Sequence, residues 1–173
     1  MSDGNYVIRL EQVIKQMLTP MKDIPFNLVI ESMSGHKVIF FDFENLEHNE
    51  LLGLLKQSAL LAGNKINETG IFRSRPNEVG NDIEPFIKEA LNSLDLKASV
   101  PTGPSGAKKS TGYPDILFWF KDKPYYLECK TYNADNIATT QRSFYFSPSD
   151  EFKVIHDAPH FLMSFEIFVA AES

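Results

Sequence analysis

The sequence predicts an α/β fold in which a central mixed β-sheet is flanked by helices. Apolar residues recur at helical spacing in three segments, residues 6–18, 46–62 and 81–94. Two runs rich in Phe, Tyr, Ile and Leu, residues 112–130 and 160–169, have the composition of buried strands. With 173 residues, of which 43% are apolar and 23% charged, the chain is long enough to bury one core. We therefore expect one globular domain with a small N-terminal extension.

The first third of the chain reads as a helix, a hairpin and a second helix. Val7, Leu10 and Ile14 share one face of the first helix, which is predicted to face the core. Residues 26–43 hold two β-rich runs on either side of a Ser-Gly pair, which predicts a hairpin. Residues 1–68 are accordingly predicted to be a helix-hairpin-helix extension that serves dimerisation or DNA contact.

Residues 69–173 are expected to form the main domain. It begins with a connector that lacks periodicity and continues with a helix whose apolar stripe includes Ile83, Ile87 and Leu91. The remaining elements follow in order: a short strand at 96–100, a loop at 101–112, a hairpin at 112–130, a polar segment at 133–143 and a last buried strand at 160–169.

Three charged residues stand inside the apolar hairpin, Asp115 near its start and Glu128 and Lys130 near its end. A four-residue turn at 121–124 would place Asp115 directly opposite Lys130. Because side chains alternate along a strand, Glu128 is expected on the same face. The opposite face is expected to be apolar and to pack on helices; it consists of Ile116, Phe118, Phe120, Tyr125, Leu127 and Cys129.

Two carboxylates and one ammonium on one sheet face suit phosphodiester hydrolysis. Asp115 and Glu128 can hold Mg²⁺, which prefers few protein carboxylates together with waters and phosphate oxygens. Lys130 can then steady an attacking water or the charge that grows on the phosphate. The alternative is structural: an ion pair between Asp115 and Lys130 beside a solvated Glu128, since opposite charges across strands are common.

The same residues resemble the motif of the PD-(D/E)XK nuclease superfamily. Pro114-Asp115 is followed by twelve residues and then by Glu128-Cys129-Lys130, with a hairpin between them. The resemblance covers residues 78–169 and implies a restriction-endonuclease-like core. It implies DNA hydrolysis to a 5′-phosphate with Mg²⁺, for which Mn²⁺ can substitute. Asp115 and Glu128 would bind the metal, and Lys130 would be catalytic.

Two further residues enter through this resemblance. The superfamily usually adds an acidic residue from the helix before the core sheet, and Glu84 in GNDIEPFIKEAL matches that place. The alternative for Glu84 is a capping pair with Asn81 at the start of the helix. Gln141 in QRSFY resembles the Gln-x-x-x-Tyr element of the exonuclease branch, and a turn with two packed aromatic residues is the alternative.

Within the superfamily, a small chain without helicase motifs looks most like a type II restriction endonuclease. Such an enzyme is expected to cut double-stranded DNA as a homodimer. A DNA-repair or junction-resolving nuclease of the same fold is one alternative, and a non-catalytic DNA-binding or interaction module is another. The candidate DNA-contacting residues are Arg73, Arg75, Lys108, Lys109, Ser110 and Gln141.

Other kinds of site are not supported by the sequence. The stretch GPSGAKKST at 103–111 lacks the Gly-Lys-Ser/Thr core of a phosphate-binding loop, which argues against a nucleotide cofactor. The single cysteine, Cys129, cannot form an internal disulfide. His156 and His160 are separated by a proline at 159, so we expect them to bound the last strand rather than to share a metal.

The charge and hydropathy of the sequence bear on whether the protein binds nucleic acid, enters a membrane or is exported. The net charge of −6 argues weakly against broad charge-driven binding to nucleic acid, although a locally basic face in the second half of the chain is compatible with it. No apolar run approaches the ~20 residues of a membrane helix. The N-terminus MSDGNYVIRL has no hydrophobic signal region. We therefore expect a cytoplasmic protein without a membrane partner.

Overall fold

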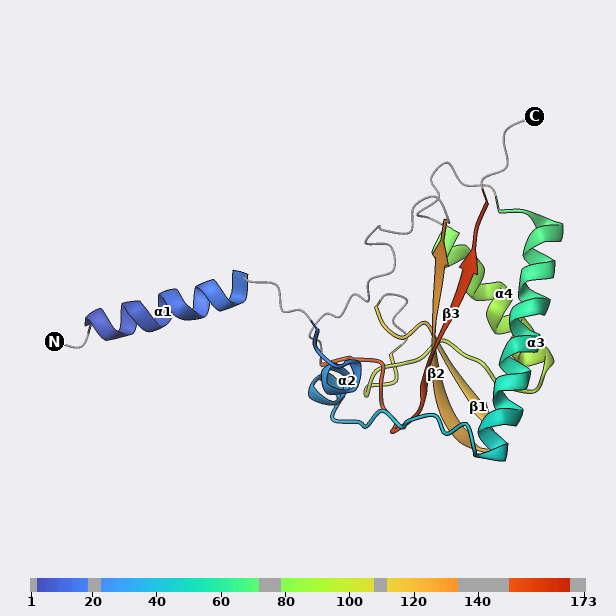
Figure 1. Ribbon diagram of the computed structural model, residues 1–173, viewed down its shortest axis with the longest axis horizontal. Coiled ribbons are helices and arrows are strands. Elements are labelled where there is room, and N and C mark those ends of the chain that lie inside the picture. The colour runs from blue at the N-terminus through green and yellow to red at the C-terminus, as the bar shows by residue number, and fades with distance from the viewer. Residues whose placement is uncertain (1–2, 19–22, 72–78, 108–111, 134–149, 169–173) are drawn as a thin grey trace.

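The computed structural model describes residues 3–18, 23–71, 79–107, 112–133 and 150–168 (Figure 1). Within these ranges the chain forms four helices and three strands. In chain order they are α1 (Asp3–Leu18), α2 (Phe26–Ser34), α3 (Leu46–Thr69), α4 (Val79–Ser93), β1 (Ile116–Phe120), β2 (Lys123–Tyr132) and β3 (His160–Glu166). No helix in the described part of the chain has the length and apolar content that a membrane span requires.

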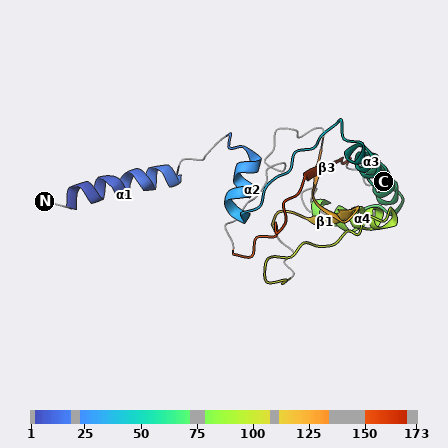
Figure 2. The ribbon, with the colours of Figure 1, turned by 90° about the horizontal axis from the view of Figure 1, so that it is seen from below.

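The three strands form one mixed sheet. β1 and β2 pair antiparallel, and β3 pairs parallel with β2, so the strand order is β1-β2-β3. α3 and α4 lie on one side of the sheet and α2 on the other (Figure 2). The strand predicted at 96–100 is reduced to one bridge, between Ser99 and Leu117, at the β1 edge. The predicted α/β class, with a mixed sheet and flanking helices, is confirmed.

Two apolar clusters fix the sheet between its helices. The larger cluster joins α3 and α4 to the hairpin face that the sequence predicted to be apolar; its buried members include Leu51, Ile87, Phe118, Leu127 and Cys129. The smaller cluster covers the other face and consists of Ile30, Tyr113, Leu117, Tyr126, Phe152, Val154 and Ala158. Cys129 is therefore a core residue, as predicted.

The turn of the hairpin is shorter than predicted. Phe120 pairs with Lys123, so the turn consists of two residues instead of four. These are Lys121 and Asp122, with φ of 49° and 59°. Two-residue turns with positive φ at both positions match the right-handed twist of the flanking strands, which favours them over a wider turn.

This turn corrects the predicted pairing of Asp115 with Lys130. Ile116 pairs with Leu127, so Asp115, one residue earlier, is level with Glu128. The observed register of β1 against β2 differs from the predicted one by two residues. A difference of one residue would have turned the side chains of one strand to the other face, but a difference of two leaves every side chain on its predicted face. The three charged residues therefore share one face, although their cross-strand partners differ from the predicted ones.

The predicted N-terminal hairpin is wrong. Its first run is the helix α2, whose Phe26, Ile30 and Met33 have helical spacing and pack into the smaller cluster. Gly35, with φ of 74°, ends the helix in the left-handed conformation. The second predicted strand is reduced to one bridge at Val38. The apolar period of the run, rather than its content of Val and Ile, decided its structure.

α1 confirms the helix predicted at 6–18 but not its burial. The helix projects away from the rest of the chain (Figure 1). Val7, Leu10 and Ile14 are 49%, 45% and 46% exposed. The prediction of a core-facing helix is wrong because α2, α3 and α4 already cover the two faces of the sheet.

α3 confirms the second predicted N-terminal helix and extends it to Thr69. Asn45 caps the helix, with its side chain accepting hydrogen bonds from the amides of Glu47 and His48. Several of its apolar residues, Leu51 among them, are buried in the larger cluster together with residues of α4. The division of the chain into residues 1–68 and 69–173 stays a prediction.

Candidate active site

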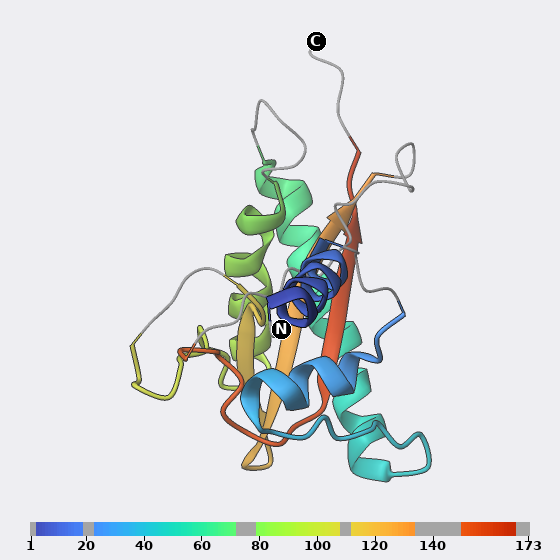
Figure 3. The same ribbon diagram turned by 90° about the vertical axis from the view of Figure 1, so that its left-hand side faces the viewer.

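α2 lies across one face of the sheet (Figure 3), the face on which Leu117 and Tyr126 are buried. Because side chains alternate along a strand, Asp115, Glu128 and Lys130 belong to this same face. Asp115 stands immediately before β1, and Glu128 and Lys130 belong to β2. Asp115 Oδ2 accepts a hydrogen bond of 2.8 Å from the amide of Cys129. Since Cys129 separates Glu128 from Lys130 in the sequence, this bond holds the Asp115 carboxylate against β2 between the two charged side chains.

Glu128 and Lys130 form an ion pair in a largely buried setting. The Lys130 Nζ lies 2.6 Å from Glu128 Oε1, and the two side chains are 20% and 6% exposed. Glu128 Oε2 is buried and has no hydrogen-bond partner among the described residues. The structural alternative with a solvated Glu128 is therefore wrong on this point. A buried carboxylate oxygen without a donor is unfavourable unless a proton shared with a neighbouring carboxylate or a bound cation satisfies it.

Glu84 belongs to the same cluster electrostatically. It is half-buried on α4. Burial and, next, the charge of Asp115 raise the pKa of Glu84 to about 7, while Lys153 and Lys130 oppose that rise. The capping pair with Asn81 is not supported, because α4 already begins at Val79. Glu84 thus lies within electrostatic reach of the hairpin charges, and its catalytic role stays a prediction.

Burial also raises the pKa of Glu128, with the charge of Asp115 adding to the rise and Lys130 opposing it. The charge of Asp115 therefore disfavours the ionised forms of both Glu84 and Glu128. A cation bound among them would relieve this repulsion. From here on we call these three residues the acid cluster.

The raised pKa of Glu84 predicts how stability depends on pH in the metal-free protein. A carboxyl group whose pKa is higher in the folded than in the unfolded state binds a proton more tightly when folded. Its contribution is present at low pH and is lost as the pH rises from 4.5 toward and past 7. The difference between 4.5 and about 7 corresponds to ~3.4 kcal/mol, and solvent screening of the half-buried carboxyl reduces the expected fall in the free energy of unfolding to about 2 kcal/mol.

Urea unfolding in EDTA at several pH values between 5 and 8 checks this prediction. Glu84→Gln should make the decline shallower and leave the part that the raised pKa of Glu128 contributes, whereas Glu89→Gln should leave the whole decline in place. Glu89 is a suitable control because it lies on the same helix, is exposed and pairs with Lys65 at 2.6 Å. Equal slopes in wild type and Glu84→Gln would contradict the assignment.

The sequence analysis overlooked a buried lysine near this cluster. Lys153 is only 3% exposed and stands between the buried residues Phe152 and Val154. Its charge lowers the pKa of Glu84. The one available signal was a lysine between two apolar residues close to a predicted buried strand, and no motif with fixed spacing marks it.

His160 and Tyr113 form a second polar contact at the site. β3 begins at His160, which confirms that this histidine bounds the last strand. Its Nδ1 is hydrogen-bonded to the hydroxyl of Tyr113, two residues before Asp115. Burial lowers the pKa of His160 to about 4, so the imidazole is neutral at physiological pH. The contact ties the start of β3 to the segment that presents Asp115.

The available donors suit a magnesium ion better than a zinc ion. No group of three or more His, Cys, Asp or Glu side chains within the described ranges could hold a metal by itself. The two carboxylates of Asp115 and Glu128, with the unpartnered Glu128 Oε2, fit Mg²⁺, which keeps several waters and takes phosphate oxygens of the substrate. Zinc would require three or four protein ligands.

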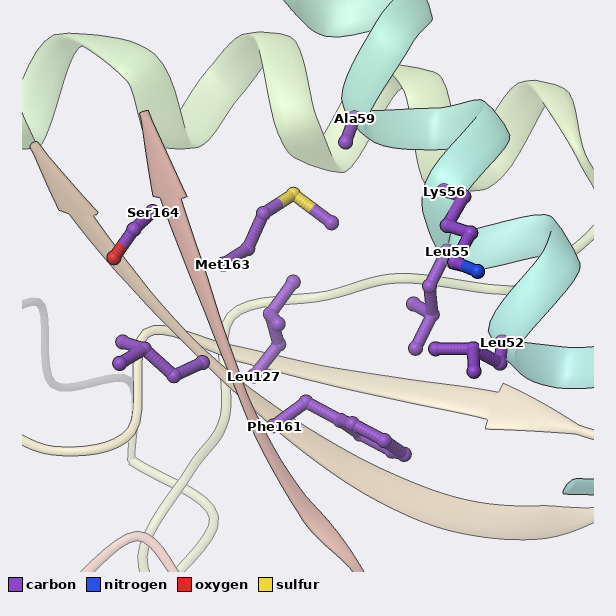
Figure 4. A pocket seen from close by; sticks show the side chains of 9 residues that line it. Leu52, Leu55, Lys56, Ala59, Leu127, Phe161, Met163 and Ser164 are labelled. Atoms are coloured by element: carbon purple, nitrogen blue, oxygen red, sulfur yellow. The ribbon is translucent and has the colours of Figure 1, made fainter. Parts of the chain in front are cut away.

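An apolar pocket elsewhere in the structure is separate from this chemistry. It lies between α3 and β3, where Leu55 and Ala59 face Leu127, Phe161 and Met163 (Figure 4). Leu127 and Met163 belong to the larger apolar cluster, on the face opposite Glu128. The pocket is therefore a gap beside the core and not the place where the charged residues meet.

Cys129 is not a nucleophile, because burial raises the pKa of its thiol far above the usual range. The structure does not describe the positions of the predicted DNA-contacting residues. Those outside the described ranges are Arg73, Arg75, Lys108, Lys109, Ser110 and Gln141. Their proposed contacts stay predictions from the sequence.

Comparison with known proteins gives two matches. The sequence profile of the type II restriction enzyme MjaV family matches residues 19–172. A curated relative, the type II restriction enzyme MjaV of Methanocaldococcus jannaschii, is 38% identical over 183 aligned residues, which cover 96% of this chain and 79% of the relative. No solved structure matches the chain.

Proposed function

Because the chain belongs to the type II restriction enzyme MjaV family, we infer that it is a site-specific endonuclease that hydrolyses phosphodiester bonds of double-stranded DNA. We propose the acid cluster and Lys130 as its active site. The observation that carries this proposal is the buried Glu128, whose Oε1 pairs with Lys130 and whose Oε2 has no donor among the described residues and lies near the Asp115 carboxylate. Glu128 Oε2 is therefore available to a ligand, and the Lys130 ammonium lies beside that position.

The proposed cofactor is Mg²⁺, or Mn²⁺ in its place, held by Asp115 and Glu128. Bound there, the ion would polarise the scissile phosphate and lower the pKa of a coordinated water. The amide of Cys129 fixes the orientation of Asp115 through a 2.8 Å hydrogen bond. Lys130 fixes Glu128 and, being 20% exposed, can also reach the attacking water or the charge that develops on the phosphate.

The order of elements supports a restriction-endonuclease-like core as the fold. α4 precedes the hairpin of β1 and β2, and β3 returns parallel to β2. The PD-(D/E)XK resemblance implies a core of helix, strand, hairpin, helix and strand; the first helix, the hairpin and the last strand are present, the first strand is reduced to the Ser99–Leu117 bridge, and the segment of the second helix lies outside the described residues. We place Glu84 as the acidic residue that the preceding helix contributes to the site.

Digestion of plasmid and phage DNA by the purified protein tests the proposed function. Discrete fragments that require Mg²⁺ and disappear with EDTA are expected. Cleavage of branched DNA alone would favour the junction-resolving alternative. Absence of cleavage on linear, supercoiled and branched DNA, by folded protein that takes up no Mn²⁺, would contradict the nuclease proposal.

We propose a second copy of the chain as the partner of α1. The described part of each chain has one acid cluster, and cutting both DNA strands needs two hydrolytic events. The side chains of Tyr6, Val7, Leu10, Val13 and Ile14 lie on one face of α1 at helical spacing and are 45–68% exposed. Paired helices with this spacing bury such a face in a symmetric dimer.

Leu10→Glu is therefore expected to weaken self-association at least tenfold. A charge at this position would have to be buried without a partner in the dimer. Gln12→Glu is a matched control, because it adds the same charge on the opposite face of α1. Sedimentation equilibrium of the two variants and the wild type measures the effect. Equal association of both variants would exclude α1 from the interface.

A further inference from the structure

Asp115 lies just outside the ladder that fixes the hairpin. The first pair of the ladder between β1 and β2 is Ile116 with Leu127, so the ladder does not include the residue before it. The Asp115 side chain is attached to β2 by the hydrogen bond from the amide of Cys129. The position of the Asp115 carboxylate therefore also depends on what holds the segment that precedes it.

Tyr113 and His160 supply a second anchor for this segment. The hydroxyl of Tyr113 is hydrogen-bonded to Nδ1 of His160, the first residue of β3. Between Tyr113 and Asp115 stands Pro114, whose ring fixes one of the two soft main-chain angles. Because this stiff residue alone separates them, a displacement of Tyr113 is passed on to Asp115. The contacts thus run from β3 through Tyr113 and Asp115 to β2.

The surroundings of His160 suit an apolar ring better than an imidazole. The centroid of the His160 ring lies 5.6 Å from that of Phe26, 5.8 Å from that of Tyr113 and 4.9 Å from that of Tyr126. Its Nε2 is buried and has no hydrogen-bond partner among the described residues. An unpartnered buried polar atom is unfavourable, whereas apolar groups in place of both members of a buried hydrogen bond can be neutral or stabilising. Stability alone therefore does not explain the pair.

We propose that Tyr113 and His160 are positioning residues of the active site, whose hydrogen bond holds the segment before β1 and thereby keeps the Asp115 carboxylate in place on the sheet face that bears Glu128. The inference rests on the proposed nuclease function and adds β3 to the elements that shape its site. Neither residue is a metal ligand in this role, because both act through Asp115.

Tyr113→Phe tests the inference with the loss of one oxygen atom. Calorimetric titration of the full chain with Mn²⁺, without DNA, should show an affinity about tenfold lower or less, the usual effect of removing a group that orients a metal ligand. In the metal-free protein, hydrogen exchange at the Cys129 amide should become faster, because this amide is bonded to Asp115 Oδ2. The KM for DNA should be unchanged, since Tyr113 does not bind the substrate in this role.

Tyr126→Phe is the matched control. It removes a hydroxyl that is also buried and that accepts a 2.9 Å hydrogen bond from the amide of Ile155. The main chain of Tyr126 stays fixed without this hydroxyl, because the residue pairs with Leu117 in β1 and with His160 in β3. The control should lose stability. Its Mn²⁺ affinity and its exchange at the Cys129 amide should equal those of the wild type.

The double variant Tyr113→Phe/His160→Phe separates positioning from stability. It removes both members of the hydrogen bond together with the unpartnered Nε2, so its unfolding temperature should be no lower than that of the wild type. Its Mn²⁺ affinity should nevertheless fall as in Tyr113→Phe. A lower unfolding temperature with wild-type Mn²⁺ affinity would show that the pair is only structural.

Wild-type Mn²⁺ affinity in Tyr113→Phe would overturn the inference, and this variant decides the matter even if the double variant fails to fold. Equal losses of affinity in Tyr113→Phe and Tyr126→Phe would also overturn it. Either result, beside a wild type that binds Mn²⁺ and cleaves DNA, would leave the proposed function intact. A wild type that neither binds Mn²⁺ nor cleaves DNA would instead contradict the proposed function, and the inference with it.

Discussion

Replacing Asp115 by Asn is expected to slow DNA cleavage by about a thousandfold or more, equivalent to ~4 kcal/mol of transition-state stabilisation. The amide oxygen of Asn can still accept the hydrogen bond from the amide of Cys129 that Asp115 Oδ2 accepts in the wild type. The substitution therefore keeps the local structure and removes the negative charge that would hold the divalent ion. The slower DNA cleavage by Asp115→Asn should be accompanied by loss of Mn²⁺ binding.

Single-turnover cleavage of a plasmid with one site measures this loss. Asp122→Asn is the matched control, because it makes the same change in the turn of the same hairpin, where the Asp122 side chain is 98% exposed. Asn also accommodates the positive φ of 59° at that position. If Asp115→Asn cleaved within tenfold of the control, the carboxylate would not be part of the active site.

Replacing Lys130 by Met is expected to slow cleavage by about two to three orders of magnitude, the usual effect of removing one group that stabilises charge in the transition state. Met retains an apolar stem of similar length and removes the ammonium that lies 2.6 Å from Glu128 Oε1. Glu128 then loses the partner that opposes the rise of its pKa. Some loss of stability should therefore accompany the loss of rate.

Comparison with Lys123→Met separates catalysis from simple loss of an ion pair. Lys123 lies in the same strand and pairs with Glu47 at 2.6 Å, but its side chain is 61% exposed. Thermal unfolding identifies the temperature at which each variant is fully folded, and cleavage is compared there. Wild-type cleavage by folded Lys130→Met would show that the ion pair with Glu128 is structural.

The main features of the site followed from the sequence because they depend on local periodicity. Side chains alternate along a strand, so Asp115, Glu128 and Lys130 share a face in any register that differs by an even number of residues. The same alternation put Cys129 in the core. The buried face of α4, which includes Ile83 and Ile87, was also predicted correctly, because apolar residues at helical spacing share one face of a helix.

The N-terminal errors arose where local signals conflicted or were insufficient. The run that forms α2 is rich in residues that favour strands, yet Ile30 is completely buried against the sheet because its period is helical. The stripe of α1 correctly predicted a helix. Whether that stripe faces the chain's own core depends on which surfaces other elements have already covered, and a local pattern does not carry that information.

The sequence by itself determined the α/β class, the hairpin, the faces of its residues and the three charges that they gather. Tertiary structure alone decided the two-residue turn, the pairing of Glu128 with Lys130 in a buried setting and the burial of Lys153. The physical reason is that alternation and helical period are properties of neighbouring residues. Burial and electrostatic partners instead depend on segments far apart in the chain, which only the folded structure brings together.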